Sequence, residues 1–307
     1  MTFYNREDVI ALSPHWKGER FDDGRPRVSD QILDRLRDAT IEEVWAPMWD
    51  LGFKYQFEGS LNRTNQNRKM IGRALTTVML PSRPDVHMQL LRHGQNEEGR
   101  RGFFNQWVVD ELQEGDILVV DMCDKVYQGT FVGGNLSTAI KSRTKNGGAI
   151  VWGGIRDLSQ IISIEDFQLY YRGIDPTPIG DVMLGGINVP CRIGNAICMP
   201  GDVVIGTESG VIFIPAHLAE DVAVRCEKTK VKDMFGFERL QSGTYKSADI
   251  DRNIWSKAVF DDFLHWFATS PLAQDYQYLD WTAEKEEVES GKDGEFTGIV
   301  TVKTTVV

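Results

Sequence analysis

The stretch GGNLSTAIKSRTKNGGAIVWGGIRD, residues 133–157, contains more structural information than any other part of the chain. A glycine pair, Gly133–Gly134, precedes a helix-like segment at 136–145, and a buried-looking strand follows at 149–152. With the apolar run upstream, this order predicts two parallel strands joined by a helix. Because the carboxyl ends of parallel strands meet at one sheet edge, the glycine turn and Arg156–Asp157 should lie together.

These residues carry chemistry suited to a 2-oxo acid chelated to a metal. A glycine turn at a helix start presents backbone N–H groups to an anion. Arginine grips a carboxylate with two parallel hydrogen bonds, and aspartate binds hard divalent cations through oxygen. Each feature also has a structural explanation, since glycine-rich turns are common and an Arg–Asp pair often only starts a helix. The combination of the glycine turns with the Arg–Asp pair at one sheet edge favours an anion and metal site.

The composition fits a cytoplasmic enzyme. With 307 residues, of which 41% are hydrophobic and 26% charged, the chain can form one large or two modest cores. It has no apolar run long enough to cross a membrane, and its charged first twenty residues lack the apolar segment of a signal peptide. A net charge of −11 argues against a nucleic-acid partner. We therefore expect neither a membrane nor a nucleic-acid partner.

Scattered polar residues add little to this picture. The five histidines form no zinc motif, and the four cysteines lack C-x-x-C spacing, which predicts free cytosolic thiols. A basic cluster either lies in a solvated loop or helps to hold an anionic substrate. Its members are Arg63, Arg68, Lys69 and Arg73.

The chain divides into an N-terminal arm at 1–27, a main domain at 28–240 and an extension at 241–307. Apolar spacing after residue 28 predicts two short helices, with breaks near Thr40 and Pro47. Further along, we expect a charged, amide-rich insertion at 84–102, short strands at 180–215, a helix at 216–238, an aromatic helix at 260–267 and an acidic run at 283–295. The extension either covers a neighbouring subunit or the site mouth, or packs on its own domain.

Four segments carry a family resemblance. The segment from Gly133 through Ile161 resembles the glycine-turn and Arg–Asp pattern of the RraA-like family, named for the regulator of ribonuclease activity A. GDILVVD at 115–121, IGRALTTV at 71–78 and PGDVVIGTESGVIFIP at 200–215 are similar to its neighbouring motifs. The likeness covers 28–240 with order and spacing kept. The family also contains divalent-metal-dependent aldolases that cleave pyruvate from branched 2-oxo acids and often decarboxylate oxaloacetate.

The resemblance implies an α/β fold: a layered, swivelling β/β/α domain, here with N-terminal helices and a C-terminal extension. It further implies a homotrimer or dimer of trimers with sites between subunits. The sequence independently supports the α/β class.

The resemblance also assigns roles. It makes Arg156 and Asp157 the catalytic pair, with Asp157 as the ligand of Mg²⁺ or Mn²⁺, which polarises the 2-oxo group and stabilises the enolate. It places the pyruvyl carboxylate against Gly133, Gly134, Asn135, Leu136 and Arg156. A further metal carboxylate comes from the C-terminal helix of an adjacent subunit in this family. Asp233 falls nearest to that acid, and Glu238 is an alternative that also fits a solvated helix position.

The chain departs from the family where acids are usual. Asn135, Trp152 and Trp45 stand at acidic positions, and the turn at 206–210 reads GTESG. We expect less negative charge and more bulk around the metal. The predicted activity is therefore a pyruvate- or 2-oxo-acid-forming lyase acting on a larger, less acidic 4-hydroxy-2-oxo acid, for which a sugar-derived acid is a candidate.

The rival hypothesis is a non-catalytic regulator that binds a ribonuclease or another protein, as the founding member of the family does. Non-catalytic members lack the helix that carries the second acid. This chain continues well past that point, which favours catalysis.

Overall fold

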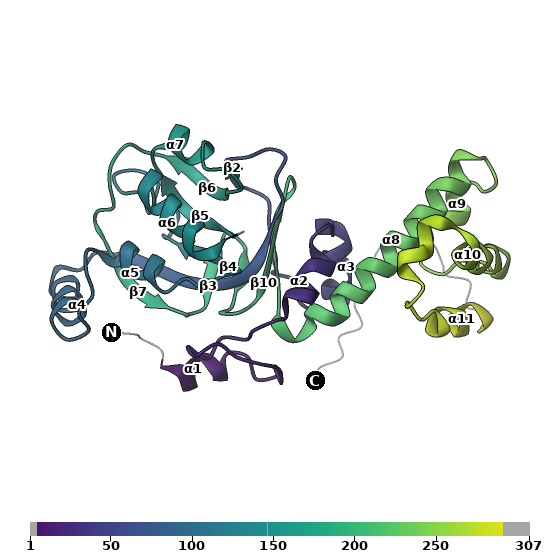
Figure 1. Ribbon diagram of the computed structural model, residues 1–307, viewed down its shortest axis with the longest axis horizontal. Helices are drawn as coiled ribbons and strands as arrows, with labels where there is room; N and C mark the ends of the chain where they lie inside the picture. The colour runs from purple at the N-terminus through teal and green to yellow at the C-terminus, as the bar shows by residue number, and fades with distance from the viewer. Residues whose placement is uncertain (1–4, 146, 291–307) are drawn as a thin grey trace.

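The computed structural model describes residues 5–145 and 147–290, which form a large mixed sheet with helices and a separate helical lobe (Figure 1). The sheet contains β1 (Phe57–Glu58), β2 (Asn62–Arg63), β3 (Met70–Pro81), β4 (Asp116–Asp121), β5 (Gly148–Ile155), β6 (Gln168–Ile174), β7 (Val182–Ile187), β10 (Val203–Thr207) and β11 (Gly210–Ile214), while β8 (Cys191–Ile193) and β9 (Ala196–Cys198) form a separate ribbon. The helices are α1 (Arg6–Ala11), α2 (Asp30–Leu36), α3 (Ile41–Asp50), α4 (Pro84–Asn96), α5 (Phe104–Asp110), α6 (Gly134–Thr144), α7 (Leu158–Ile162), α8 (Ala219–Gln241), α9 (Ser247–Ile250), α10 (Lys257–Thr269) and α11 (Thr282–Glu289), with 3-10 turns η1 (Ala216–Leu218) and η2 (Pro271–Tyr276).

The long strand β3 organises the sheet, whose order is β1-β11-β10-β3-β4-β5-β6-β2. Its first residues pair antiparallel with β10, its middle pairs parallel with β4, and its end pairs antiparallel with β7. The strands β4, β5 and β6 continue in parallel, and both β4 and β5 are buried throughout. Strands covered on both faces need no polar alternation, which explains their continuous apolar runs. The predicted parallel pair around residues 133–157 is confirmed.

Two apolar layers cover the two faces of the sheet. On one face, α4 to α7 pack over a core that includes Val151. On the other face, the β8–β9 ribbon packs over a core that includes Ile150 and Trp152. The alternation along β5 therefore sends neighbouring side chains into different layers. The predicted α/β class with N-terminal helices and a C-terminal extension is confirmed.

The two predicted N-terminal helices are α2 and α3, and the break near Thr40 is confirmed. The Thr40 hydroxyl accepts from the Glu43 N–H at 3.2 Å, and the Glu43 carboxylate accepts from the Thr40 N–H at 2.8 Å. This reciprocal cap fixes the start of α3. The predicted break near Pro47 is wrong, because α3 continues to Asp50. The proline removes one backbone donor, but its buried ring contributes to the apolar face that packs on α8.

The helix α8, 23 residues long, joins the sheet domain to the lobe (Figure 1). Its first half packs with α2 and α3 against β10 and β11. Its second half contributes Phe235, whose ring contacts Trp255, Phe263 and Trp266 at centroid distances of 5.4 to 5.7 Å. The aromatic extension thus packs on α8 of its own chain, as one of the two sequence alternatives predicts. Part of the predicted acidic run, residues 291–295, lies outside the described residues.

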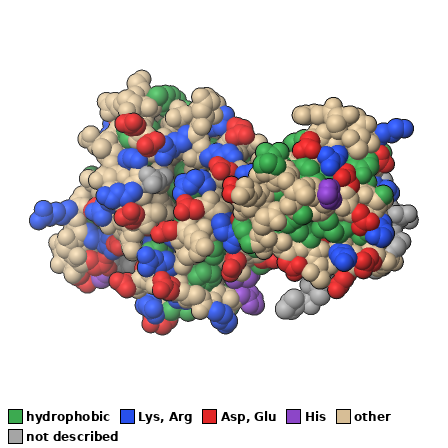
Figure 2. Space-filling view, turned by 45° about the vertical axis from the view of Figure 1, so that its right-hand side comes forward, with side chains coloured by type: hydrophobic (Ala, Val, Ile, Leu, Met, Phe, Trp, Pro, Cys, Tyr) green, Lys and Arg blue, Asp and Glu red, His purple; other side chains and the backbone are tan. Residues whose placement is uncertain are grey.

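The lobe also presents apolar side chains to solvent. Phe237, Leu272 and Tyr278 are each more than half exposed. Hydrophobic side chains are visible on the face of the lobe that Figure 2 shows, among acidic and basic ones. That the extension covers a neighbouring subunit stays a prediction.

The end of the N-terminal arm is tied to the sheet by a buried arginine. The Arg25 guanidinium is fully buried and donates to both carboxylate oxygens of Asp116 at 2.9 and 3.0 Å. It also donates to the Ala74 carbonyl and to the Asp23 carboxylate. Since Asp116 opens β4, this ion pair locks residues 20–27 against the strand that leads to the glycine turn.

Arg25→Ala is expected to lower the free energy of unfolding by about 3 to 5 kcal/mol, because it leaves the buried Asp116 carboxylate without a cation. Urea unfolding followed by circular dichroism measures the change. Arg27→Ala is the matched control, since Arg27 is 53% exposed and 3.7 Å from the Glu19 carboxylate. The control should change stability by less than about 0.5 kcal/mol. Equal effects for the two variants would show that the Arg25–Asp116 pair does not hold the arm.

Candidate functional site

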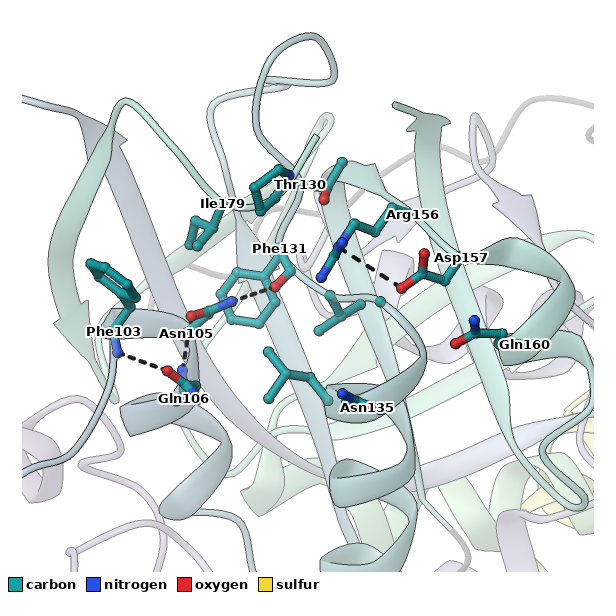
Figure 3. Close-up of a pocket in the computed structure, with 14 residues that line it drawn as sticks. Phe103, Asn105, Gln106, Thr130, Phe131, Asn135, Arg156, Asp157, Gln160 and Ile179 are labelled. Atoms are coloured by element: carbon teal, nitrogen blue, oxygen red, sulfur yellow. Dashed lines mark hydrogen bonds and ion pairs between the residues drawn. The ribbon is translucent and has the colours of Figure 1, made fainter. Parts of the chain in front are cut away.

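A pocket of about 490 Å³ opens where β5 ends, between the first turns of α5, α6 and α7 (Figure 3). It is lined by Phe103, Asn105, Gln106, Thr130, Phe131, Val132, Gly133, Asn135, Leu136, Arg156, Asp157, Gln160, Pro178 and Ile179. Five of these residues were predicted from the sequence as site residues: Gly133, Asn135, Leu136, Arg156 and Asp157. The structure brings the glycine turn and the Arg–Asp pair together at one sheet edge, as expected.

Backbone hydrogen bonds hold Arg156 at the pocket. The Phe131 N–H donates to the Gly154 carbonyl at 2.9 Å, and the Arg156 N–H donates to the Val132 carbonyl at 3.0 Å. The Arg156 side chain is 41% exposed, and its Nε lies 3.9 Å from the Asp157 carboxylate. Within the described part of the chain, its guanidinium makes no hydrogen bond. The fork of N–H donors is therefore free to take a carboxylate from the pocket.

Asp157 adopts an unusual backbone conformation at the start of α7. Its φ of 56° and ψ of 37° lie in the left-handed region, which is uncommon for residues other than glycine and concentrates at functional sites. One carboxylate oxygen accepts from the Gly134 N–H at 3.2 Å. The other oxygen has no hydrogen bond to any described residue. This geometry leaves one carboxylate oxygen available to a ligand in the pocket.

The donor set fits a hydrated divalent cation. Mg²⁺ and similar hard cations take oxygen ligands and often keep several waters beside one or two carboxylates. Asp157 offers one such oxygen, and its side chain is 32% exposed, so water can complete the coordination. Residues 5–145 and 147–290 contain no group of three or more His, Cys, Asp or Glu side chains placed to hold a metal. Asp157 is the one carboxylate that the described lining of this pocket offers to a cation.

The absence of side chains at Gly133 and Gly134 lets the Asp157 carboxylate and the Gln160 amide lie close to the backbone of the turn. A Cβ on Gly133 would lie 2.3 Å from the Asp157 carboxylate, and a Cβ on Gly134 would lie 2.1 Å from the Gln160 amide oxygen. The helix α6 starts at Gly134, two residues earlier than predicted. Its first-turn N–H groups have no acceptor within the helix. The Gly134 N–H goes to Asp157, so the amides of Asn135 and Leu136 are those available to an anion.

Gly133→Ala is expected to weaken binding of oxalate in the presence of Mn²⁺ by about tenfold or more, because the added methyl displaces Asp157 and Arg156. Isothermal calorimetry measures the affinity. Gly180→Ala is the control, since its nearest neighbouring atom would lie 3.8 Å away and Gly180 adjoins the opposite wall. If the two variants bound oxalate equally well, the close packing at Gly133 would have no role in the site.

The opposite wall was missed from the sequence. It is formed by residues at the start of α5 and by the loop between β6 and β7, with Phe103 and Ile179 facing Arg156 and Asp157 across the pocket in Figure 3. The predicted insertion at 84–102 contains α4 and ends directly before Phe103. Two phenylalanines, Phe103 and Phe104, directly after a polar insertion were the available sequence signal. The insertion thus leads into the site.

The tryptophans at the family's acidic positions do not line this pocket. Trp152 packs on the other sheet face, beneath the Arg172 guanidinium at 4.4 Å. Trp45 stacks on Trp49 in α3 with ring centroids 4.8 Å apart. The turn at 206–210 joins β10 to β11 and also lies outside the lining. The expectation that two tryptophans add bulk around the metal is therefore wrong for the pocket of a single chain.

The candidate second acids lie on α8. Asp233 is exposed there and does not line the pocket, so one chain does not bring it to Asp157. Its contribution from an adjacent subunit stays a prediction. The alternative, Glu238, accepts from the Trp266 indole N–H at 2.9 Å and from Arg239 at 2.7 Å. These contacts tie α8 to α10 and explain Glu238 as a structural residue.

The basic cluster is structural as well. Arg63 contacts Gln66, Arg68 pairs with Asp166, Lys69 donates to backbone carbonyls between α2 and α3, and Arg73 is buried against Val28 and Asp30. None of the four lines the pocket. The hypothesis that they hold an anionic substrate is wrong for the pocket of one chain, and the interpretation as a solvated loop is wrong for Arg73.

All four cysteines are free, as predicted, and no helix in the described ranges could span a membrane.

Comparisons with known proteins show which family and which folds the chain resembles. The sequence model of the RraA-like family, described as Aldolase/RraA, matches residues 26–213. A protein of Halalkalibacterium halodurans, named "Putative 4-hydroxy-4-methyl-2-oxoglutarate aldolase", is 30% identical over 126 residues, which are 40% of this chain and 57% of the relative.

Two solved structures share the fold. One is RraAS2 of Streptomyces coelicolor, described as an unusual member of the RNase ES inhibitor RraA protein family, with a TM-score of 0.59 and 22% identity over 69% of this chain and 100% of that one. The other is an uncharacterized protein of Pseudomonas syringae pv. tomato, with a TM-score of 0.62 and 17% identity over 77% of this chain and 99% of that one. At these identities they show likeness of fold.

Proposed function

The chain belongs to the RraA-like family, and we propose that it is a divalent-metal-dependent lyase that cleaves a 4-hydroxy-2-oxo acid between C3 and C4. The observation that carries the proposal is the pairing of two unsatisfied groups in one pocket. The Arg156 guanidinium has no hydrogen-bond partner among the described residues, and one oxygen of Asp157 is likewise free. A guanidinium that can bind a carboxylate, beside a carboxylate that can bind a metal ion, suits a 2-oxo acid chelated to a metal.

The binding pose follows from the two free groups. Arg156 would hold the C1 carboxylate through two parallel hydrogen bonds, assisted by the first-turn N–H groups of Asn135 and Leu136. Asp157 would hold Mg²⁺ or Mn²⁺ through its free oxygen. When bound, that cation supplies Lewis-acid stabilisation of the negative charge that develops at the 2-oxo oxygen. Arg156 and Asp157 are therefore the proposed catalytic residues.

The described lining offers no histidine and no carboxylate besides Asp157. Asp157 already accepts from the Gly134 N–H, and its remaining oxygen would hold the cation. We therefore expect water in the pocket to take the proton of the 4-hydroxyl group and to return a proton to C3 of the enolate, which gives pyruvate. Arg156 keeps the carboxylate oriented while the C3–C4 bond breaks.

The family resemblance adds a quaternary proposal. The chain would act in the cytoplasm as a homotrimer or dimer of trimers, with Asp233 of an adjacent subunit approaching the cation. The exposed position of Asp233 on α8 and the exposed apolar side chains of the lobe support this proposal. Small-angle scattering of the purified protein tests the oligomeric state.

The activity is tested with purified protein and Mg²⁺ or Mn²⁺ on a panel of 4-hydroxy-2-oxo acids and oxaloacetate. Pyruvate is followed with a coupled dehydrogenase. Release that disappears with a chelator and returns with added metal is the expected result. No release from any member of the panel would rule out the lyase assignment.

The same protein sample tests the rival function, a regulator that binds a ribonuclease or another protein. Calorimetry with Mn²⁺ and oxalate should show metal-dependent binding if the pocket works as proposed. An absence of such binding would favour the interaction protein.

A further inference from the structure

The pocket has two chemically unlike walls. One contains Arg156 and Asp157, which are the charged side chains among its described lining residues. The other contains Phe103, Pro178 and Ile179 together with side-chain amides. Figure 3 shows Phe103 and Ile179 across the pocket from Arg156 and Asp157. A substrate bound by its carboxylate at Arg156 extends its other end toward the second wall.

The second wall is unsuited to a second carboxylate. Arg156 is the cation of the described lining, and the proposed pose uses it for the C1 carboxylate. A distal carboxylate would lose hydration against Phe103 and Ile179 without gaining a cation, which is unfavourable. Phe103 is 55% exposed, so its ring offers free hydrocarbon surface to a ligand. Ligand pockets are lined mainly by hydrophobic and aromatic side chains, which contact the apolar part of a ligand.

Most polar groups of this wall already make hydrogen bonds within the protein. The Asn105 amide donates to the Phe131 carbonyl at 2.8 Å, and its oxygen accepts from the Gln106 N–H at 3.0 Å. The Thr130 hydroxyl donates to the Thr177 carbonyl. The Gln106 oxygen accepts from the Phe103 N–H at 2.9 Å, which leaves the Gln106 amide N–H₂ as a free donor. This free amide gives the wall one donor for an oxygen of the distal group.

Given the proposed function, on which this step rests, we infer that the substrate is a monocarboxylic 4-hydroxy-2-oxo acid whose distal group is uncharged and mainly hydrocarbon. Phe103 and Ile179 are the residues that select this group. The product aldehyde or ketone is then an uncharged carbonyl compound. This narrows the sequence expectation of a less acidic substrate to one whose distal group carries no charge.

Binding of matched 2-oxo acids tests the inference without requiring turnover. Calorimetry in the presence of Mn²⁺ compares pyruvate, 4-methyl-2-oxopentanoate and 2-oxoglutarate, which share the carboxylate and the 2-oxo group. We expect 4-methyl-2-oxopentanoate to bind about tenfold more tightly than pyruvate, from partial burial of its branched tail. 2-Oxoglutarate should bind no more tightly than pyruvate. Tighter binding of 2-oxoglutarate than of 4-methyl-2-oxopentanoate would overturn the inference.

Two variants test whether Phe103 and Ile179 select the distal group of the substrate. Phe103→Ala should reduce the advantage of 4-methyl-2-oxopentanoate, and Ile179→Arg should improve binding of 2-oxoglutarate by about tenfold. Ile174→Arg is the control, since Ile174 is 51% exposed on β6 and lies outside the lining. An Ile179→Arg variant with the same preference as the control would also overturn the inference.

Failure of the proposed function gives a different pattern. If the predicted binding order held while no 4-hydroxy-2-oxo acid released pyruvate, the lyase assignment would fail and the chemistry of the second wall would stand. If pyruvate were released from 4-hydroxy-2-oxoglutarate as readily as from 4-hydroxy-2-oxopentanoate, the lyase would stand and the inference would fail. If none of the 2-oxo acids bound, both would fail.

Discussion

Arg156→Gln is expected to lower kcat/KM for a 4-hydroxy-2-oxo acid by about 100- to 1000-fold. A charge pair desolvated in a pocket contributes about 2 to 5 kcal/mol when one partner is removed, and each 1.4 kcal/mol is a factor of ten. The described lining contains no other cation that could replace the guanidinium. Arg156→Lys should recover only part of the loss, because an ammonium cannot form the parallel pair of hydrogen bonds. Steady-state pyruvate release measures all three proteins.

Arg143→Gln is the matched control for this experiment. Arg143 lies at the other end of α6 and, like Arg156, has a side chain that is 41% exposed. Its partner is Asp110 at 2.8 Å, on the surface and outside the pocket. The control should keep kcat/KM within about twofold, since exposed ion pairs contribute little. Wild-type kcat/KM for Arg156→Gln, with folding intact by circular dichroism, would show that the carboxylate binds elsewhere.

The charged wall of the pocket could be predicted because its residues belong to one short unit of chain. Gly133 and Asp157 are separated by one helix and one strand, and glycine breaks mark each boundary. Local sequence signals and the rule for parallel strands agree here, so the position of the pair follows without knowledge of the remaining fold. Hydrogen bonds from Phe131 and Arg156 then fix the details.

The opposite wall could not be predicted in this way. Phe103 and Ile179 are far apart in the sequence, and they meet because α5 and the loop after β6 pack at the same sheet edge. That contact depends on tertiary packing across the layers. The sequence also did not show on which face of the sheet the Trp152 side chain lies. Strand β5 is buried on both faces, so its sequence shows no apolar–polar alternation from which a face could be assigned.

The helical lobe shows the same limit. The aromatic helix was recognisable from its composition, but its partner is the second half of α8, where Phe235 is the buried aromatic side chain. A single buried aromatic in this half of the helix gives a weak periodic signal. The ring contacts around Phe235 become evident only once α10 folds back on α8.

Asp157→Asn is expected to abolish metal-dependent pyruvate release, with a loss of about 1000-fold or more, and to weaken Mn²⁺ binding correspondingly. The substitution removes the negative charge that a hard cation requires. Asparagine tolerates the left-handed conformation, and its side-chain oxygen can still accept from the Gly134 N–H. The variant therefore removes the negative charge while it keeps the backbone conformation, so a loss of Mn²⁺ affinity reports the role of the charge. Calorimetric titration with Mn²⁺, in the presence and absence of oxalate, measures the affinity.

Asp166→Asn provides the control because Asp166 has a similar positive φ but does not line the pocket. Its φ is 55°, close to the 56° of Asp157, and it follows the same short helix, where its carboxylate pairs with Arg68. This variant should bind Mn²⁺ as the wild type does, since its carboxylate faces solvent. If Asp157→Asn retained wild-type Mn²⁺ affinity while Arg156→Gln lost oxalate binding, the pocket would be an anion site without a cation. The left-handed Asp157 would then serve only to cap the glycine turn, and the chemistry would need a carboxylate from outside this chain.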